Sequence, residues 1–355
     1  MLLSVGIAPG FPKFVLVIKT LKNIRFLLFP FNILYGGVMA IRNRLFDMGI
    51  FNSECFSTPS IGVGNLSMGG TGKSVVVMYL LKNLGGKKHI AVLSRGYGRK
   101  TKGIIVATKN DNAATLGDEP FQFLQRYPET LVVVAEKRIQ GMKAIEAIEA
   151  SPDKVILDDV MQHRWIRPQI MIMTSSYERP YFRDFVFPVG GLREFRSGVK
   201  RANILLITRS PENLSPQQKE EYLKEINVNI PVFFTKVKYD DVLSQKEKTQ
   251  NSSILKNGFL LVTGIANADH LVIFLKNQYY GAFDHLKFKD HHSYSIADGQ
   301  MIHQRAGGKI ILTTEKDYAK LDGVLECKNL YYIKIELDFV FEEEQQLFDK
   351  MIKSV

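Results

Sequence analysis

Cysteine is scarce in this chain, with only Cys55 and Cys327 among its 355 residues. Two cysteines so far apart supply neither a disulfide framework nor the clustered thiolates of a structural zinc site. Small secreted domains held together by disulfide bonds are therefore excluded. We expect two buried thiols and a reducing, cytosolic compartment.

The N-terminal region has no acidic residue before Asp47 and no uninterrupted apolar run long enough to cross a membrane. Its longest apolar stretch, residues 26–41, contains 16 residues and is interrupted by Pro30, Asn32 and a glycine pair. A spanning helix needs about 20 apolar residues. A secretory signal begins with positive charge, whereas the first lysine here follows two prolines. The sequence thus favours neither a transmembrane helix nor a signal peptide.

Apolar residues recur at helical spacing just before and into this stretch, with basic residues on another face. The apolar set is Phe14, Ile18, Leu21, Ile24 and Leu28. A basic amphipathic helix of this kind is typical of segments that lie in the membrane interface. We therefore predict that residues 1–45 are membrane-associated. A helix that simply packs on the protein core is the alternative, because amphipathicity is common to both.

The whole chain carries 47 basic and 36 acidic residues, which gives a net charge of +11. This excess favours an anionic partner, such as nucleic acid, anionic lipid or a phosphorylated substrate. At 355 residues the chain exceeds one ordinary domain, and it contains no internal repeat or low-complexity tract. Two lobes are therefore expected.

Short apolar runs alternate with helical segments between residues 60 and 208. The runs are apolar throughout rather than at every second position, which is typical of strands buried on both faces. They cover residues 60–64, 89–94, 104–108, 131–135, 154–159, 170–174 and 204–208, with helices expected over 73–84, 119–126 and 137–149. We predict an α/β fold with a doubly wound, mostly parallel sheet, whose ligands bind beyond the carboxyl ends of the strands.

A smaller α/β unit follows, with strands expected near 259–265, 282–288 and 310–314. The hydrophilic residues 240–253 are typical of an exposed loop. We interpret 232–239 and 331–339 as two strands that pair into a hinge between the lobes. The predicted organisation is a phosphate-binding lobe over 46–231, a second lobe over 232–339 and a C-terminal helix over 340–355.

Residues 60–81, SIGVGNLSMGGTGKSVVVMYLL, have the order strand, glycine-rich turn and helix start that a phosphate-binding loop requires. Backbone N–H groups of such a loop, together with the helix N-terminus, hold phosphate groups. The predicted nucleotide ligands are Gly69, Gly70, Thr71, Gly72, Lys73 and Ser74, with the Ser74 hydroxyl on Mg²⁺. Ser67 replaces the first glycine of the pattern, which is acceptable only where no positive φ is needed. The alternative is a glycine-rich turn before an ordinary helix.

Three polar clusters follow at strand ends. SRGYGR, residues 94–99, offers Arg95 for phosphate oxygens. In GDEP, residues 117–120, Asp118 is either a helix N-cap or the acceptor of a proton from a substrate hydroxyl. In VILDDVMQHR, residues 155–164, a buried strand ends in Asp158 and Asp159, one of which is expected to hold Mg²⁺.

Further clusters lie closer to the C-terminus. In GGLREFRSGVKRAN, residues 190–203, Arg193 suits a transition state rich in phosphate charge, and Glu194 is a further candidate metal ligand. KFKDHHSY, residues 287–294, places two histidines beside Asp290, which suits a proton relay. TTEKD, residues 313–317, starts a helix with Thr314 as its cap and has no evident chemical role. A solvated basic loop is the alternative for the arginine-rich segment.

Taken together, these segments resemble the tetraacyldisaccharide 4′-kinase family of lipid A biosynthesis. The matching segments, in order, are VGNLSMGGTGKS, LSRGYGR, GDEP, LDDVMQHR, LRE with KRAN, VTGIAN, KDHHSY and TTEKD. Ser67 is normal in this family. The family usually has Thr-Pro where Ser74 and Val75 stand, and Gly-Phe where Val160 and Met161 stand. The lost glycine puts the backbone posture after Asp159 in question.

The resemblance implies transfer of the ATP γ-phosphate to the 4′-hydroxyl of an acylated glucosamine disaccharide 1-phosphate, with ATP and Mg²⁺ as cofactors. It implies Asp118 as the base, assisted by His291 of the second lobe, with Lys73 and Arg193 at the phosphates. It also implies two α/β/α lobes with a two-stranded linker, at the cytoplasmic face of the bacterial inner membrane. We expect a monomer with no nucleic acid partner.

Two other functions share the phosphate loop. A membrane-associated nucleotide switch or ATPase would leave the GDEP carboxylate and the histidines of a separate lobe without a role. A kinase of a soluble metabolite would leave the N-terminal segment without one.

Overall fold

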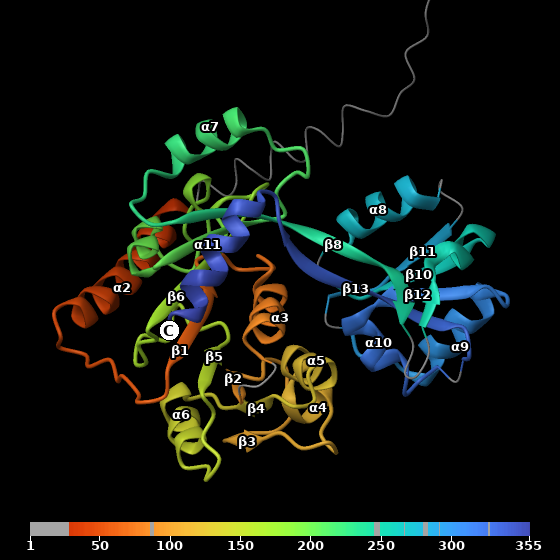
Figure 1. Cartoon of the computed structure of the whole chain (residues 1–355), viewed down its shortest axis with the longest axis horizontal. Helices are drawn as coiled ribbons and strands as arrows, with labels where there is room; N and C mark the ends of the chain where they lie inside the picture. The colour runs from red at the N-terminus through yellow and green to blue at the C-terminus, as the bar shows by residue number, and fades with distance from the viewer. Residues whose placement is uncertain are drawn as a thin grey trace, which may run out of the picture.

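The computed structural model describes residues 28–85, 89–244, 249–265, 267–279, 283–290, 292–325 and 327–355. Two α/β lobes lie side by side and are joined by a pair of long strands (Figure 1). The N-terminal residues 14–27, on which most of the amphipathic prediction rests, lie outside the described part of the chain. No helix within the described residues has the length and apolar character needed to cross a bilayer.

The larger lobe is built on a mostly parallel sheet. Its strands are β1 (Ser60–Asn65), β2 (Ile90–Ser94), β3 (Ile105–Val106), β4 (Leu131–Val134), β5 (Lys154–Leu157), β6 (Ile170–Ser176) and β7 (Ile204–Thr208). Their order is β3-β4-β2-β5-β1-β6-β7, parallel except for β3 at the edge. The prediction of a doubly wound parallel sheet is confirmed, with β3 shorter than expected.

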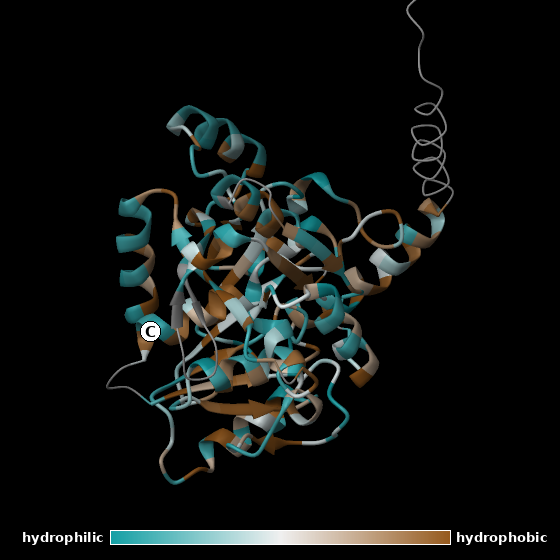
Figure 2. Cartoon of the chain, turned by 90° about the vertical axis from the view of Figure 1, so that its right-hand side faces the viewer, coloured by the Kyte–Doolittle hydropathy of each residue, from teal (hydrophilic) through white to brown (hydrophobic). Residues whose placement is uncertain are grey.

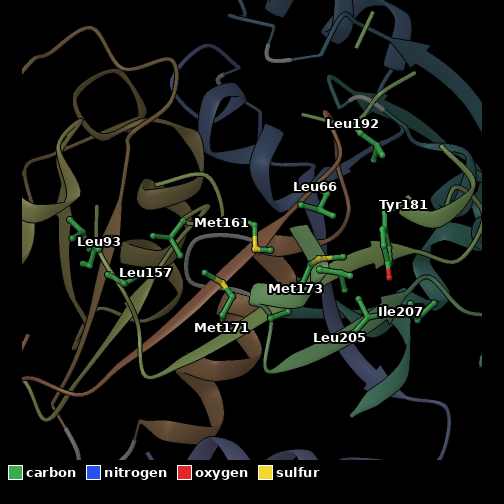
Figure 3. Close-up of a cluster of buried hydrophobic side chains, with 14 of the residues drawn as sticks. Leu66, Leu93, Leu157, Met161, Met171, Met173, Tyr181, Leu192, Leu205 and Ile207 are labelled. Carbon is green, nitrogen blue, oxygen red and sulfur yellow. The ribbon is translucent and has the colours of Figure 1, made fainter. Parts of the chain in front are cut away.

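Helices cover this sheet, as its continuous apolar strands require. They are α2 (Phe29–Asp47), α3 (Lys73–Leu84), α4 (Ala113–Leu116), α5 (Asp118–Arg126), α6 (Arg138–Glu146), α7 (Pro216–Ile226) and the 3-10 turns η1 (Tyr181–Arg183) and η2 (Arg196–Arg201). Every residue of β1 and β2 is buried. Figure 3 shows one of the resulting cores, which extends from Leu93 and Leu157 through Met173 to Leu205 and Ile207.

The smaller lobe repeats the α/β pattern. Its elements are β9 (Thr249–Asn251), η3 (Ser252–Asn257), β10 (Phe259–Thr263), α8 (Asp269–Tyr279), β11 (Phe283–Lys287), α9 (Ile296–Ala306), β12 (Ile310–Thr314) and α10 (Glu315–Leu321). Strands β11, β10 and β12 are parallel neighbours with their own apolar cores. The Thr314 hydroxyl accepts a hydrogen bond from the Asp317 amide, so the predicted cap of α10 is confirmed.

Two strands, β8 (Val232–Ser244) and β13 (Leu330–Phe339), join the lobes. They pair antiparallel with each other, while β8 also pairs with β7 and β13 with β12, so that one sheet runs through both lobes. The predicted pairing of 232–239 with 331–339 is confirmed. Helix α11 (Glu342–Lys353) then returns to the larger lobe, where Phe348 and Ile352 are buried.

Two expectations are corrected by the structure. The predicted loop 240–253 is largely regular, because β8 continues to Ser244 and β9 turns back to pair with it. Hydrogen bonds between the two strands satisfy the backbone, so a hydrophilic sequence does not prevent a strand here. The thiols are not both buried: Cys55 is exposed and Cys327 is partly exposed.

Candidate active site

The loop between β1 and α3 has the backbone of a phosphate-binding turn. Gly69 and Gly72 have φ values of 123° and 80°, a region that side chains rarely adopt. Ser67 is not among the described residues with positive φ, so its replacement of a glycine costs no strain. Gly72 directly precedes α3 and its carbonyl accepts hydrogen bonds from the amides of Val75 and Val76. The free amides at the start of α3 therefore face the loop.

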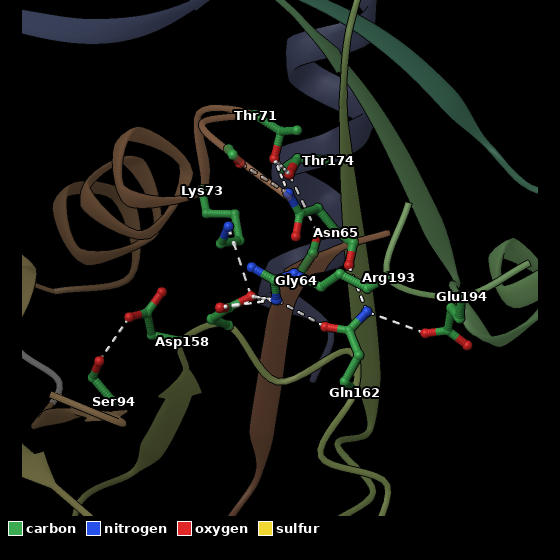
Figure 4. Close-up of polar contacts among 12 residues, drawn as sticks. Gly64, Asn65, Thr71, Lys73, Ser94, Asp158, Gln162, Thr174, Arg193 and Glu194 are labelled. Carbon is green, nitrogen blue, oxygen red and sulfur yellow. Dashed lines mark hydrogen bonds and ion pairs between the residues drawn. The ribbon is translucent and has the colours of Figure 1, made fainter. Parts of the chain in front are cut away.

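Buried hydroxyl and amide groups hold this loop in place from the neighbouring strands (Figure 4). The Asn65 amide donates to the Thr71 hydroxyl over 2.8 Å, and the hydroxyls of Thr71 and Thr174 are 2.7 Å apart. The Thr208 hydroxyl donates to the Thr71 carbonyl over 2.9 Å. Thr71 therefore anchors the loop to β1, β6 and β7 rather than reaching outward, and this fixes the loop before any ligand binds.

A cluster of opposite charges lies in front of the loop. The Lys73 ammonium is 3.6 Å from an Asp159 oxygen, and the Arg193 guanidinium lies 3.1 and 3.2 Å from the two oxygens of the same carboxylate. Arg193 also donates to the Gln162 side chain over 3.0 Å. These two cations hold the pKa of Asp159 below its usual range although burial opposes them. The structure thus brings three predicted site residues together.

Asp159 has a φ of 46°, which places the sharp turn after β5 at this residue. Val160, which stands where the related family has glycine, is not among the described residues with positive φ and is buried. The lost glycine therefore leaves the backbone of this turn unstrained at position 160.

Asp158 points to the other side of the turn and is fully buried. One of its oxygens accepts a hydrogen bond from the Ser94 hydroxyl over 2.8 Å, while the other, Oδ1, has no partner among the described residues. Burial first, and then the nearby charges of Glu119 and Asp159, raise the pKa of Asp158 to about 7. A buried carboxylate with an unsatisfied oxygen is the environment that a bound cation would relieve.

Glu119 completes this acidic group, although it was not predicted from the sequence. It lies in the first turn of α5, and its carboxylate accepts a hydrogen bond from the Ser74 hydroxyl over 2.6 Å. The signal was present in GDEP, where the second acidic residue follows Asp118. Ser74, Asp158 and Glu119 offer only oxygen ligands, which Mg²⁺ prefers.

These oxygen groups suit a magnesium ion that binds together with a nucleotide, rather than an ion that is held by protein ligands alone. Within the described ranges, no group of three or more His, Cys, Asp or Glu side chains converges closely enough to hold an ion by itself. Mg²⁺ keeps several waters and is commonly bound by one or two carboxylates together with substrate phosphates. The donor set at the head of α3 therefore suits a metal that arrives with a nucleotide.

Asp118, at the start of α5, faces the same cavity. Gly117 is the N-cap of this helix and no side chain caps it, so the structural alternative for Asp118 is wrong. Its Oδ2 lies 2.7 Å from the Lys320 ammonium and 3.8 Å from that of Lys316, both on α10 of the smaller lobe. Neither lysine was predicted from the sequence as a site residue.

A cavity of about 840 Å³ connects these groups with the smaller lobe. Its wall includes the phosphate loop, Asp118, Asp158 and Asp159 from one side and Asn267, His270 and Asp290 from the other. The predicted His291 lies outside the described residues. Its neighbour His292 packs against Phe288 and Tyr294, and the His292 carbonyl lies 3.4 Å from the Lys320 ammonium.

The remaining predicted residues differ in position. Arg95 is exposed and lines the cavity. Glu194 is 2% exposed, and its oxygens accept hydrogen bonds from Asn43, Gln162 and Arg201 at 2.6 to 3.1 Å. Figure 4 shows Glu194 on the far side of Gln162 from Asp158. These hydrogen bonds tie Glu194 to α2 and η2 beside the cavity, which indicates a structural role.

Two arginines in the cavity wall were not predicted. Arg138 is 3% exposed and donates a hydrogen bond to the Asp158 carbonyl over 3.0 Å, which stabilises the turn after β5. Arg209 follows β7 with a φ of 56°, and a Cβ added to Gly70 would lie 3.6 Å from its guanidinium. Neither arginine belongs to a glycine-rich or acidic motif, so only the sheet order brings them to the loop.

Comparison with known proteins identifies the family of this chain. A family model described as tetraacyldisaccharide-1-P 4′-kinase matches residues 24–355. The chain is 42% identical to the tetraacyldisaccharide 4′-kinase of Flavobacterium johnsoniae over 332 residues, which covers 93% of this chain and 96% of that one. It is 36% identical to the protein of the same name from Bacteroides thetaiotaomicron over 349 residues, 92% of this chain and 91% of that one.

A solved structure shares the fold. It is described as the "apo" form of LpxK from Aquifex aeolicus in complex with ATP, and it superposes with a TM-score of 0.75 at 30% identity. The match covers 93% of this chain and 99% of that one. With a family model over nearly the whole chain, relatives that match along their full length and a shared fold, the chain belongs to the tetraacyldisaccharide-1-phosphate 4′-kinase family, the ATP-dependent kinases of lipid A biosynthesis.

Proposed function

We propose that the cavity between the lobes is where this kinase transfers the γ-phosphate of ATP to the 4′-hydroxyl of an acylated glucosamine disaccharide 1-phosphate. The observation that carries the proposal is that Asp118 lines the same cavity as Lys73 and the phosphate loop. Phosphoryl transfer needs positioned reactants and neutralised charge more than covalent chemistry by the protein. The cavity offers a carboxylate for the hydroxyl and cations for the phosphates.

The nucleotide phosphates would be held at the head of α3. The N–H groups of the loop from Gly69 to Gly72 and the start of the helix bind the β- and γ-phosphates, and Lys73 neutralises them. Arg193, now paired with Asp159, would turn to the transferring group, and exposed Arg95 would reach phosphate oxygens from the cavity rim.

Mg²⁺ would be held by the Ser74 hydroxyl and by a carboxylate of Asp158 or Asp159, with Glu119 beside them. The unpartnered Oδ1 of Asp158 and the Ser74–Glu119 hydrogen bond support this donor set. When bound, the ion supplies positive charge that neutralises phosphate oxygens. Glu194 is left out of this set because three neighbours already bond to its oxygens.

Asp118 would accept the proton of the sugar hydroxyl. It projects from the N-terminal turn of α5, where its negative charge is favoured by the helix dipole. The assistance of His291 remains a prediction. The neighbouring residue His292 lies within reach of the same lysine as Asp118, so the histidine segment and the proposed base belong to one corner of the cavity.

The lipid part of the substrate would remain at the membrane surface beside α2. Tyr35 and Met39 of this helix line the cavity, while Leu34, Val38 and Ile41 are exposed. Figure 2 shows hydrophobic residues along the helix. An exposed apolar stripe of this kind suits the interface of a bilayer. We place the protein as a monomer at the cytoplasmic face of the inner membrane.

The test supplies labelled ATP with a tetraacylated disaccharide 1-phosphate or with buffer alone. We expect labelled lipid with the acceptor and little free phosphate without it. Free phosphate in both arms would favour a nucleotide switch or ATPase, and label in a soluble sugar but not in the lipid would favour a metabolite kinase. Asp118→Ala should lower kcat by about 10²- to 10⁴-fold with little change in ATP affinity, as removal of a positioned base does.

A further inference from the structure

Helix α10 of the smaller lobe packs antiparallel on α5 of the larger lobe. At the start of α10, Glu315 accepts hydrogen bonds from Gln122 over 2.9 Å and from Arg126 over 3.1 Å. At its other end, Lys320 reaches Asp118. The two helices therefore meet at both ends, and the end that carries Lys320 lies on the proposed base.

The contact between Lys320 and Asp118 is close and shielded. The ammonium is 2.7 Å from Oδ2, and the two side chains are 12% and 14% exposed. Lys316, one turn earlier, lies 3.8 Å from the same oxygen. Because both lysines approach Oδ2, they restrain rotation of the carboxylate about its Cβ–Cγ bond. Charged partners at this distance form the stronger class of hydrogen bond.

We propose that Lys320 is the positioning residue of the proposed base, so that the Asp118 carboxylate is correctly oriented only while α10 of the smaller lobe is docked on α5. The inference rests on the proposed function, since it assigns a partner to the base of that same site. It also gives a role to the TTEKD segment, because that segment starts the helix that carries Lys320.

A role that is limited to holding α10 on α5 explains the contact less well. Docking of α10 is already supplied at its first turn, where Glu315 meets Arg126 and Gln122. A shielded ion pair also adds little net stability, because the cost of removing both charges from water offsets much of their attraction. Lys320 also lies 3.4 Å from the His292 carbonyl, so one ammonium holds both the base and the histidine segment. Misplacing a reacting group by about 1 Å can cost about 100-fold in rate.

The first experiment compares Lys320→Met with the wild-type full-length enzyme. We expect kcat to fall by roughly 10- to 100-fold while KM for ATP changes by less than about 3-fold, since the nucleotide ligands are untouched. Lys320→Arg, which keeps the charge, should recover at least part of the loss. Unchanged kcat in Lys320→Met would overturn the proposal.

A double-mutant cycle with Asp118→Ala then separates positioning from adhesion. If Lys320 acts through Asp118, Lys320→Met should lower the residual turnover of Asp118→Ala by less than about 3-fold. An equal loss in both backgrounds would refute the assignment. Glu315→Gln is the matched control: it removes the negative charge from the other inter-lobe contact of α10 but keeps an oxygen that can accept the hydrogen bonds of Gln122 and Arg126, so kcat should change by less than about 3-fold.

Two outcomes remain distinct. Full turnover of Asp118→Ala would reject the proposed base itself. A silent Lys320→Met beside an impaired Asp118→Ala would reject only the positioning role. Should Lys320→Met fail to fold in a thermal melt, Lys316→Met removes the longer contact and is taken through the same cycle, with a smaller loss and the same dependence on Asp118 expected.

Discussion

Lys73 is the residue on which the proposed hold on the nucleotide depends most directly. Its side chain is 11% exposed and its ammonium already lies in the cavity, 3.6 Å from Asp159. A cation fixed where charge develops is worth far more than one that must be recruited from solvent. In the absence of ATP, the carboxylate of Asp159 balances the positive charge of Lys73.

Replacing Lys73 by alanine should lower phosphate transfer by more than about 100-fold, because no other side chain of the loop offers a positive charge to the γ-phosphate. Transfer of label from ATP to the lipid acceptor measures this. Lys82→Ala is the control, since Lys82 belongs to the last turn of the same helix and pairs with Glu336. Turnover of Lys73→Ala within a few-fold of wild type would contradict the assignment.

The raised pKa of Asp158 predicts that the stability of the protein depends on pH. Burial raises its pKa to about 7, far above the value of an unfolded carboxyl, so the folded state binds the proton more tightly. The stability linked to this group is present at low pH and is lost as the pH rises from about 4 through about 7. Without divalent metal, Asp158→Asn should therefore melt at a higher temperature than wild type at pH 8.

This difference in melting temperature should shrink towards pH 5, where the wild-type carboxyl is protonated and uncharged like the amide. Thermal melts of both proteins across this range in a chelating buffer measure it. A difference that does not depend on pH would contradict the raised pKa. Turnover with Mg²⁺ and ATP should fall in Asp158→Asn if this carboxylate holds the ion.

Helix α2 has one face that packs on the protein and another that is exposed. The residues that interrupt its apolar sequence serve packing: the Asn32 amide donates to the Val186 carbonyl, Gly36 fits against the Phe195 ring, and Pro30 stands at the tolerated first turn. Its other face leaves apolar side chains exposed. One face of α2 therefore packs on the protein, and the other carries the exposed apolar side chains on which the proposed membrane contact rests.

Changing Leu34, Val38 and Ile41 together to glutamine should reduce binding to anionic lipid vesicles by at least about tenfold, because each buried apolar side chain contributes roughly 1.5–3 kcal/mol. The fold should survive, since these side chains are 66%, 58% and 65% exposed. Vesicle sedimentation and a thermal melt measure the two effects. Undiminished sedimentation of a folded variant would reject α2 as a membrane contact.

The whole molecule depends on how the lobes are joined. Beyond the β8–β13 pair, Arg126 of α5 bonds to Glu315 on α10 and to the carbonyl of Ile335 and the carboxylate of Glu336 on β13. This arginine is 10% exposed, so its charge and the Glu315 charge are largely withdrawn from water. The junction therefore ties α5 of the larger lobe to α10 of the smaller lobe and to the linking strand β13.

Arg126→Ala should destabilise the protein by about 2 kcal/mol or more, because it leaves the shielded carboxylate of Glu315 without its charged partner. It should also lower kcat, since α10 would no longer dock firmly on α5. Denaturant unfolding and kinetics with the lipid acceptor measure the two effects. A stable variant with full turnover would show that the lobes need no such junction. Arg183→Ala, which breaks an exposed pair with Glu225, is the control.

The sequence by itself determined the secondary-structure elements and the local chemistry. These features could be predicted because each depends on neighbours a few positions away in the chain. They are the apolar strands, the glycine-rich loop with Lys73 and Ser74, and the paired aspartates. Only the tertiary structure decided which distant groups meet. Glu119 on Ser74, Lys320 on Asp118 and the three partners of Glu194 join segments from different elements. Such contacts depend on sheet order and lobe docking, which arise from packing of the whole chain rather than from any one stretch of it.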